Sequence, residues 1–103
     1  MNTTNIPYSP EHRKELAKFC GLEDIDTYSG SKNCLRVLGR EILYGITYEC
    51  FLLPDGRVLV TREDRYVPMT KASLYPDRAT WSQWWYTDRF KWERDPETGR
   101  YRT

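Results

Sequence analysis

The sequence predicts an α+β fold, in which an N-terminal helix packs on a small antiparallel sheet of about residues 34–63, followed by a short tryptophan-rich helix and a C-terminal β-hairpin. Three observations predict this fold. Apolar residues recur at helical spacing within 10–20, they alternate with period two from residue 42, and all four tryptophans fall within 81–92. The 103 residues fit one domain spanning 1–103.

The first expected element is a helix over about residues 10–20. Ser9 is a preferred N-cap residue, and Pro10 follows at the first helical position, where its missing N–H costs nothing. Leu16 and Phe19 recur at helical spacing, and Gly21 is placed to end the helix in a left-handed conformation. The polar segment that follows is expected to form a loop.

The sheet is predicted from an alternation of apolar residues that begins at Ile42 and continues to Leu52. A period of two places these residues on one buried face of a strand. The Pro-Asp-Gly segment at 54–56 predicts a tight reversal, and the β-branched segment 57–63 then returns as the neighbouring strand.

The start of the sheet has two interpretations. A reversal at Gly39-Arg40 would pair residues 34–38 with 41–45 as two strands. Apolar residues at helical spacing also fit a helix over 32–39. We favour the strands, which make the sheet a meander.

The tryptophans predict a second, short helix. Thr80 and Gln83 have the T-x-x-Q spacing of a capping box, in which side chains satisfy free backbone N–H groups at the start of a helix. Trp81, Trp84 and Trp85 then stand at positions i, i+3 and i+4 and share one helical face. Three large aromatic residues on one stripe are expected to pack this helix onto the sheet.

The segment after Asp88 predicts a hairpin and the main candidate binding site. Its residues alternate with period two, and a turn with Pro96 and Gly99 follows. In such a hairpin an indole and three guanidinium groups share one face, which suits stacking on a base beside phosphates as well as cation–π packing within the core. The candidate partner-binding residues are Arg89, Trp92, Arg94, Arg100, Tyr101 and Arg102.

The sequence contains no catalytic or metal-binding motif that we recognise. His12, the only histidine, has no catalytic partner at a recognisable spacing, and we expect it to be solvated. Cys20, Cys34 and Cys50 include no C-x-x-C pair, so we expect free thiols in a reducing, cytoplasmic compartment. We expect no enzyme activity, no cofactor and no bound metal.

Charge and composition favour a soluble binding module. The net charge of +1 lacks the basic excess typical of nucleic-acid-binding domains, and no apolar segment is long enough for a membrane span or a signal peptide. We therefore expect a regulator or inhibitor that acts by protein–protein contact, and open strand edges would also allow a homodimer. These features are compatible with an accessory protein of a phage or mobile element. The alternative function is single-stranded nucleic-acid binding through the C-terminal hairpin.

Overall fold

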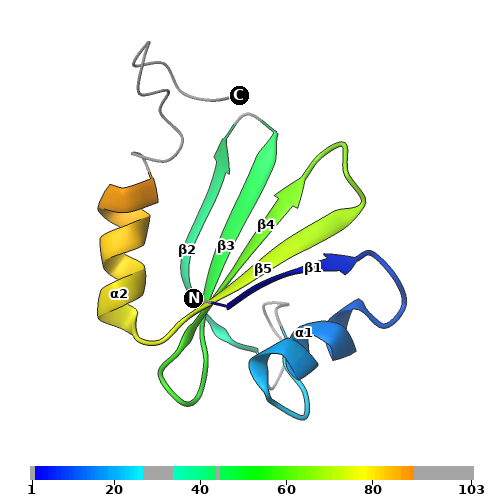
Figure 1. Cartoon of the computed structure of the whole chain (residues 1–103), viewed down its shortest axis with the longest axis horizontal. Helices are drawn as coiled ribbons and strands as arrows, with labels where there is room; N and C mark the ends of the chain where they lie inside the picture. Colours follow the sequence, from blue (N-terminus) through cyan, green and yellow to red (C-terminus); the bar gives the residue numbers. More distant parts are fainter. Residues whose placement is uncertain (1, 27–33, 44, 90–103) are drawn as a thin grey trace.

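The computed structural model describes residues 2–26, 34–43 and 45–89, and only the backbone of residue 2. These residues form a five-stranded antiparallel sheet with helices (Figure 1), which confirms the α+β prediction. The predicted C-terminal hairpin lies outside the described residues. The elements in chain order are β1 (Asn2–Pro7), α1 (His12–Cys20), β2 (Arg36–Leu43), β3 (Ile46–Leu52), β4 (Val58–Asp64), β5 (Met69–Tyr75), α2 (Arg78–Gln83) and the π-helical segment η1 (Trp84–Asp88).

The sheet is a meander completed by the first strand. β2 to β5 pair in sequence order, each antiparallel to the next. The meander predicted for about 34–63 holds β2 to β4, whereas β5 was not predicted. β1 then pairs antiparallel with β5, from Asn2 opposite Leu74 to Pro7 opposite Met69. The order across the sheet is therefore β1-β5-β4-β3-β2, with β1 and β2 as the edge strands (Figure 1).

The helix α1 begins two residues later than predicted. Glu11 precedes its first residue, and Ser9 belongs to the turn before it, where the Ser9 hydroxyl accepts a hydrogen bond from the Glu11 N–H (3.3 Å). The predicted end is confirmed, because Gly21 has a φ of 71°. The N–H groups of Gly21 and Leu22 donate to two carbonyls of the last helical turn (3.1 and 2.9 Å). This Schellman motif satisfies carbonyls that the end of a helix leaves free.

The first predicted reversal is wrong. β2 continues through Gly39 as one strand, with a β-bulge between Val37 and Gly39. The chain reverses instead at Gly45, whose φ is 79°. The glycine at position 39 serves packing instead, since a Cβ atom there would lie 3.2 Å from the indole of Trp85. Glycine is needed at position 39 for the close approach of a side chain rather than for a turn.

The second predicted reversal is confirmed. The loop between β3 and β4 contains Gly56 with a φ of 93°. Asp55 accepts hydrogen bonds from the backbone N–H of Arg57 (3.0 Å) and from its guanidinium (2.6 Å). These bonds hold the turn, and the backbone N–H of Arg57 is the main cause of the lowered pKa of the Asp55 carboxyl.

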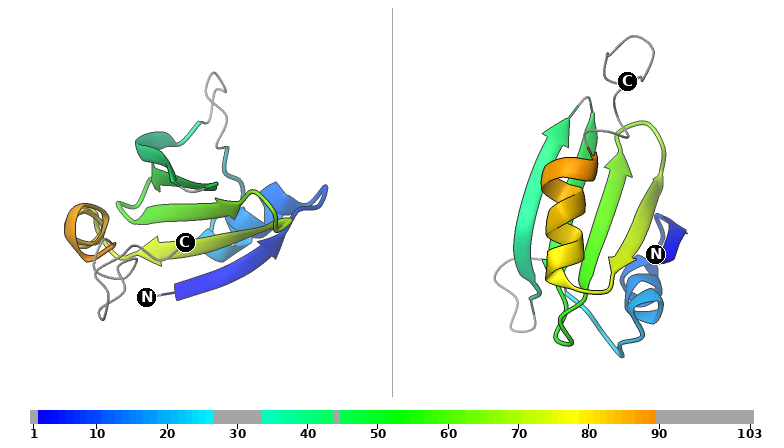
Figure 2. Two further views of the ribbon diagram at one scale, coloured as in Figure 1. Left: turned by 90° about the horizontal axis from the view of Figure 1, so that it is seen from above. Right: turned by 60° about the vertical axis from the view of Figure 1, so that its left-hand side comes forward.

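The two faces of the sheet carry separate apolar clusters. The cluster on the α1 face joins the sheet to α1, and its buried members include Leu16, Phe51 and Leu59. The cluster on the α2 face joins the sheet to α2 and η1 and includes Val60 and Trp85. Figure 2 shows α2 lying against one face of the sheet in the right-hand view, while α1 lies next to β1. The sheet therefore forms the middle layer between helices.

The tryptophan helix starts earlier than the capping-box prediction. Asp77 is the N-cap, and its side chain accepts a hydrogen bond from the N–H of Thr80 (2.7 Å). At Trp84 the α-helix continues as the π-helical segment η1. Trp81 and Trp85 are buried and Trp84 is half-buried against the sheet. The prediction that these tryptophans pack the helix onto the sheet is confirmed.

Candidate functional site

Arg89, one of the six residues predicted to bind a partner, directly follows η1 and is only 4% exposed. Its guanidinium carbon lies 3.8 Å from the centre of the Trp85 ring, and it forms an ion pair with Glu41 of β2. Through these two contacts Arg89 links the end of the helix to β2 of the sheet. The other five lie outside the described part of the chain: Trp92, Arg94, Arg100, Tyr101 and Arg102.

The indole N–H of Trp81 is buried and, within the described residues, has no hydrogen-bond partner of good geometry. It faces the thiol of Cys50, a weak acceptor. Burial raises the pKa of Cys50 to about 12, against the opposing influence of the Trp81 N–H. Because Trp81 is only 3% exposed and stacks on Trp85 (5.9 Å between centroids), this group belongs to the core.

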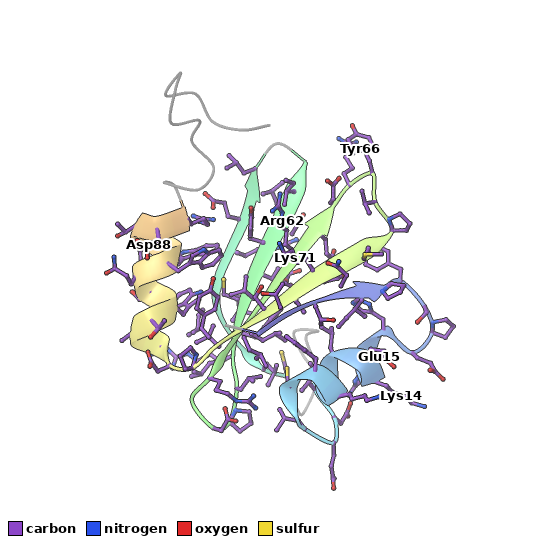
Figure 3. The ribbon with its side chains drawn as sticks, viewed as in Figure 1. Lys14, Glu15, Arg62, Tyr66, Lys71 and Asp88 are labelled. Carbon is purple, nitrogen blue, oxygen red and sulfur yellow. The ribbon has the colours of Figure 1, made fainter. Side chains whose placement is uncertain are left out.

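Large apolar side chains are exposed where the β2–β3 and β4–β5 hairpins end. Ile42 is 65% exposed and Tyr66 is 82% exposed, and Figure 3 shows Tyr66 at the tip of the turn between β4 and β5. The N–H of Arg65 donates to the carbonyl of Gly45 (3.0 Å), which joins the two hairpin ends. We define the hairpin-end surface by its large apolar residues, which are Tyr8, Ile42, Tyr66, Val67 and Met69.

Tyr8 and Ile42 of the hairpin-end surface line a hollow of about 370 Å³. Its lining includes Tyr8, Ile42, Glu63 and Arg65. The Arg65 guanidinium also lies over the ring of Tyr66, 5.8 Å from the ring centre, which keeps this long cationic side chain on the surface. The hollow therefore combines aromatic, aliphatic and charged groups in its lining, and Tyr66 stands beside it on Arg65.

Polar side chains beside the hollow form a connected group on the α1 face. Burial raises the pKa of Tyr8, a hydrogen bond with Thr70 opposes the rise, and the charge of Glu63 adds to it. His12 meets Tyr8 edge-on (5.4 Å between centroids), with Nε2 3.4 Å from Thr70 Oγ1 and Nδ1 3.3 Å from the Pro7 carbonyl oxygen.

His12 is thus half-buried and in contact through both ring nitrogens, in contrast to the solvated residue that we expected. The neighbouring hydroxyl of Thr70 resembles a nucleophile beside a base. Thr70 is 0% exposed, however, so its hydroxyl is not accessible to a substrate. The contact between His12 and Thr70 therefore orients α1 against the sheet.

Neither a metal site nor a membrane-spanning helix is found within the described ranges. In these ranges no group of three His, Cys, Asp or Glu side chains lies close enough together to bind a metal ion. None of the described helices combines the length and the apolar character needed to cross a bilayer. The three cysteines are free thiols; Cys20 and Cys50 are buried and Cys34 is half-buried.

The hairpin-end surface was missed by the sequence analysis because its residues come from separate segments. Tyr66, Val67 and Met69 surround a proline in the β4–β5 turn, and Ile42 was assigned to a buried strand face. A signal existed in the apolar segment YVPM, since turns are usually built from small and polar residues. Two large apolar side chains in a turn and a third at the start of the next strand indicate an exposed contact surface.

Comparison of the chain with protein-family models, curated proteins and solved structures gives no match.

Proposed function

We propose that the protein is a non-enzymatic binding module, a regulator or inhibitor, that recognises a protein partner through the hairpin-end surface. The proposal is carried by the exposed apolar side chains at the adjoining hairpin ends, two of which, Tyr8 and Ile42, line a hollow. Single apolar residues scattered over a surface are ordinary, whereas a contiguous patch with a polar rim is typical of an interaction site.

The chemistry of the hairpin-end surface supports a protein as the partner. Tyrosine, methionine and arginine are enriched in protein interfaces, and tyrosine and arginine supply many of the side chains that dominate binding energy. Tyr66 and the Arg65 side chain over it would bury a large area on contact. Glu63 and Arg65 give the hollow charges of both signs, which favour a complementary protein surface over a uniformly charged polymer.

A second copy of the chain is one partner that the hairpin-end surface can accept. Light scattering over a concentration series tests this partner directly. A mass that rises to twice the monomer mass for the wild type, and stays at the monomer mass for Tyr66→Ala, identifies a homodimer. A constant monomer mass directs the search to a different protein.

The free thiols support a reducing compartment such as the cytoplasm.

Two exposed tyrosines provide matched positions for a test with an unknown partner. Tyr66 lies in the hairpin-end surface, and Tyr86, which is 67% exposed, lies on η1 outside it. Each is replaced in turn by the photo-crosslinker p-benzoylphenylalanine in cells that produce the protein. A partner that is captured at position 66 and not at position 86 is then purified, and calorimetry measures its affinity.

Tyr66→Ala is expected to weaken this binding by roughly 30-fold, because a central interface tyrosine contributes about 2 kcal/mol. Tyr86→Ala should leave the affinity within about twofold. Both side chains are exposed, so both variants should keep the unfolding temperature of the wild type within a few degrees. Capture at position 86 alone, or equal losses of affinity in the two variants, would contradict the proposed surface.

A further inference from the structure

The edge strand β1 has an unpaired side. Within the part of the chain that the structure describes, β1 pairs only with β5. The unpaired edge of a strand presents backbone N–H and C=O groups that can bind another extended chain.

The outward backbone groups of β1 belong to Thr3 and Asn5. The N–H of Tyr8 donates to the carbonyl of Pro68 on the β5 side (3.2 Å). Antiparallel strands alternate between residues that bond their neighbour and residues whose N–H and C=O point away, so every second residue counted back from Tyr8 bonds β5. Pro7 falls in the outward set, where its missing N–H removes no bond from the pairing with β5.

A groove of about 520 Å³ lies between this edge and α1. Residues 4–7 of β1 form one wall. The other wall is formed by Glu11, Glu15, Lys18 and Phe19. Glu11 is the N-cap of α1 and the four recur at i, i+4, i+7 and i+8, so they lie along one side of the helix. Leu16, Ala17 and Cys20 of α1 are buried in the core, and Phe19 packs partly against it.

The helix wall of the groove is acidic along most of its length. Glu11 and Glu15 are exposed, and no cation among the described residues forms an ion pair with either. Figure 3 shows Glu15 on the side of α1 toward β1. Lys18 and the half-buried ring of Phe19 lie at the far end of this wall. The complementary ligand is cationic at one end and apolar at the other.

We propose that this groove binds an extended basic segment of a partner protein, which adds to β1 as a sixth strand. Alternate side chains of a strand are about 6.8 Å apart, and residues four apart in a helix are about 6 Å apart along its axis. Glu11, Glu15 and Phe19 therefore match three alternate side chains of the segment. α1 runs back along β1 (Figure 1), so a segment that is antiparallel to β1 runs in the same direction as α1. From its N-terminus such a segment meets Glu11, then Glu15, then Phe19, and its complementary sequence is basic-x-basic-x-apolar. This site is distinct from the hairpin-end surface.

The capped heptapeptide TKTKTVT is the probe for this site. Titrated into the ¹⁵N-labelled full chain, it should produce saturable NMR shifts at the amides of Thr3 and Asn5 and along the groove side of α1. The acidic peptide TETETVT should bind at least about tenfold more weakly, because the groove wall repels it. N-methylation of the peptide amides that face β1 should abolish binding, whereas N-methylation of the alternate amides should be tolerated.

Charge reversal of the groove wall provides the matching test on the protein. The double variant Glu11→Lys/Glu15→Lys should weaken TKTKTVT binding at least about tenfold and strengthen TETETVT binding. The control variant Glu23→Lys reverses one charge at an exposed glutamate that does not line the groove. This variant should bind TKTKTVT within about twofold of the wild type. If the double lysine variant does not fold, Glu11→Gln/Glu15→Gln removes the same charges with less perturbation.

Three outcomes overturn the proposal: no saturable shifts at millimolar peptide, equal binding of the two peptides, or shifts that map away from β1 and α1. Tyr66→Ala should leave peptide binding unchanged, because Tyr66 lies in the hairpin-end surface and not in the groove. The groove and the hairpin-end surface are thereby tested independently.

Discussion

Replacing Gly39 by alanine tests the packing between β2 and the tryptophan helix. The added Cβ atom would lie 3.2 Å from two carbon atoms of the Trp85 indole, closer than the optimal separation of about 3.5–4.0 Å between carbon atoms. Trp85 is 7% exposed and packs in a buried cluster, so the indole has little room to move away. Overpacking of this kind destabilises a protein by about 1–3 kcal/mol.

The backbone has an opposing effect. Alanine inside a strand is more stable than glycine by about 0.5–1 kcal/mol, because glycine loses more conformational freedom on folding. The overlap with Trp85 outweighs this gain, so Gly39→Ala is expected to lower the free energy of unfolding by about 1 kcal/mol. In a domain of this size, that loss lowers the unfolding temperature by about 4–8 °C.

Urea unfolding followed by tryptophan fluorescence measures the change. The same substitution in a Trp85→Phe background is the decisive comparison, since phenylalanine lacks the outer part of the indole. There Gly39→Ala should become neutral or stabilising, which a double-mutant cycle reports as a coupling between the two residues. A Gly39→Ala protein more stable than the wild type, or the same loss in both backgrounds, would refute the close contact.

Three further predictions concern capping, the thiols and the core. Asp77→Ala should lower the unfolding temperature at neutral pH. The hydrogen bond from the Thr80 N–H lowers the pKa of Asp77 in the folded protein below its usual 3.8. The stability that Asp77 contributes is therefore fully present above pH 3.8 and is lost as the pH falls through the lower folded pKa. Calorimetry at several pH values should show that wild type and variant differ in unfolding temperature at neutral pH and that this difference vanishes in acid. Burial raises the pKa of the Cys20 thiol to about 11 and that of the Cys50 thiol to about 12. At about pH 8 Ellman's reagent should therefore react rapidly with one thiol of the folded protein, the half-buried Cys34, and with all three thiols after unfolding. In urea titrations Leu59→Ala, at a fully buried site, should cost about 2–5 kcal/mol, whereas Ile42→Ala at an exposed site should cost less than about 0.5 kcal/mol.

The elements with strong local signals could be predicted from the sequence. The C-terminal end of α1 follows from Gly21, and the reversal between β3 and β4 follows from the segment around Gly56. The burial of Trp81 and Trp85 follows from their spacing on one helical face. In each case the deciding interaction lies within a few residues along the chain.

β1 and β5 could not be predicted because their local patterns are weak. In β5 the buried positions Thr70 and Ala72 are polar or small, so the apolar alternation is hidden. β1 contains asparagine and proline, which strands disfavour, and its extended conformation is supported by pairing with β5 far along the chain. No local pattern encodes such a pairing.

Long-range contacts also explain what the site predictions missed. Gly39 has the sequence signature of a turn, yet it makes room for Trp85. Arg89 was expected to face a partner, and in the structure it pairs with Glu41. The hairpin-end surface joins residues such as Tyr8 to two hairpins, a proximity that only the sheet order creates.

The sheet order also has a consequence for folding during synthesis. Of the five strands β1 is synthesised first, but Asn2 pairs with Leu74 and Pro7 with Met69. At about 5–20 residues per second the partner strand follows roughly 4–14 s later. The hairpins of β2 to β5 close over short loops meanwhile, whereas β1 must wait for the strand that it pairs with. Of the five strands, the first to be synthesised is therefore the last that the sheet can acquire, and until it docks β5 is the exposed edge of the sheet.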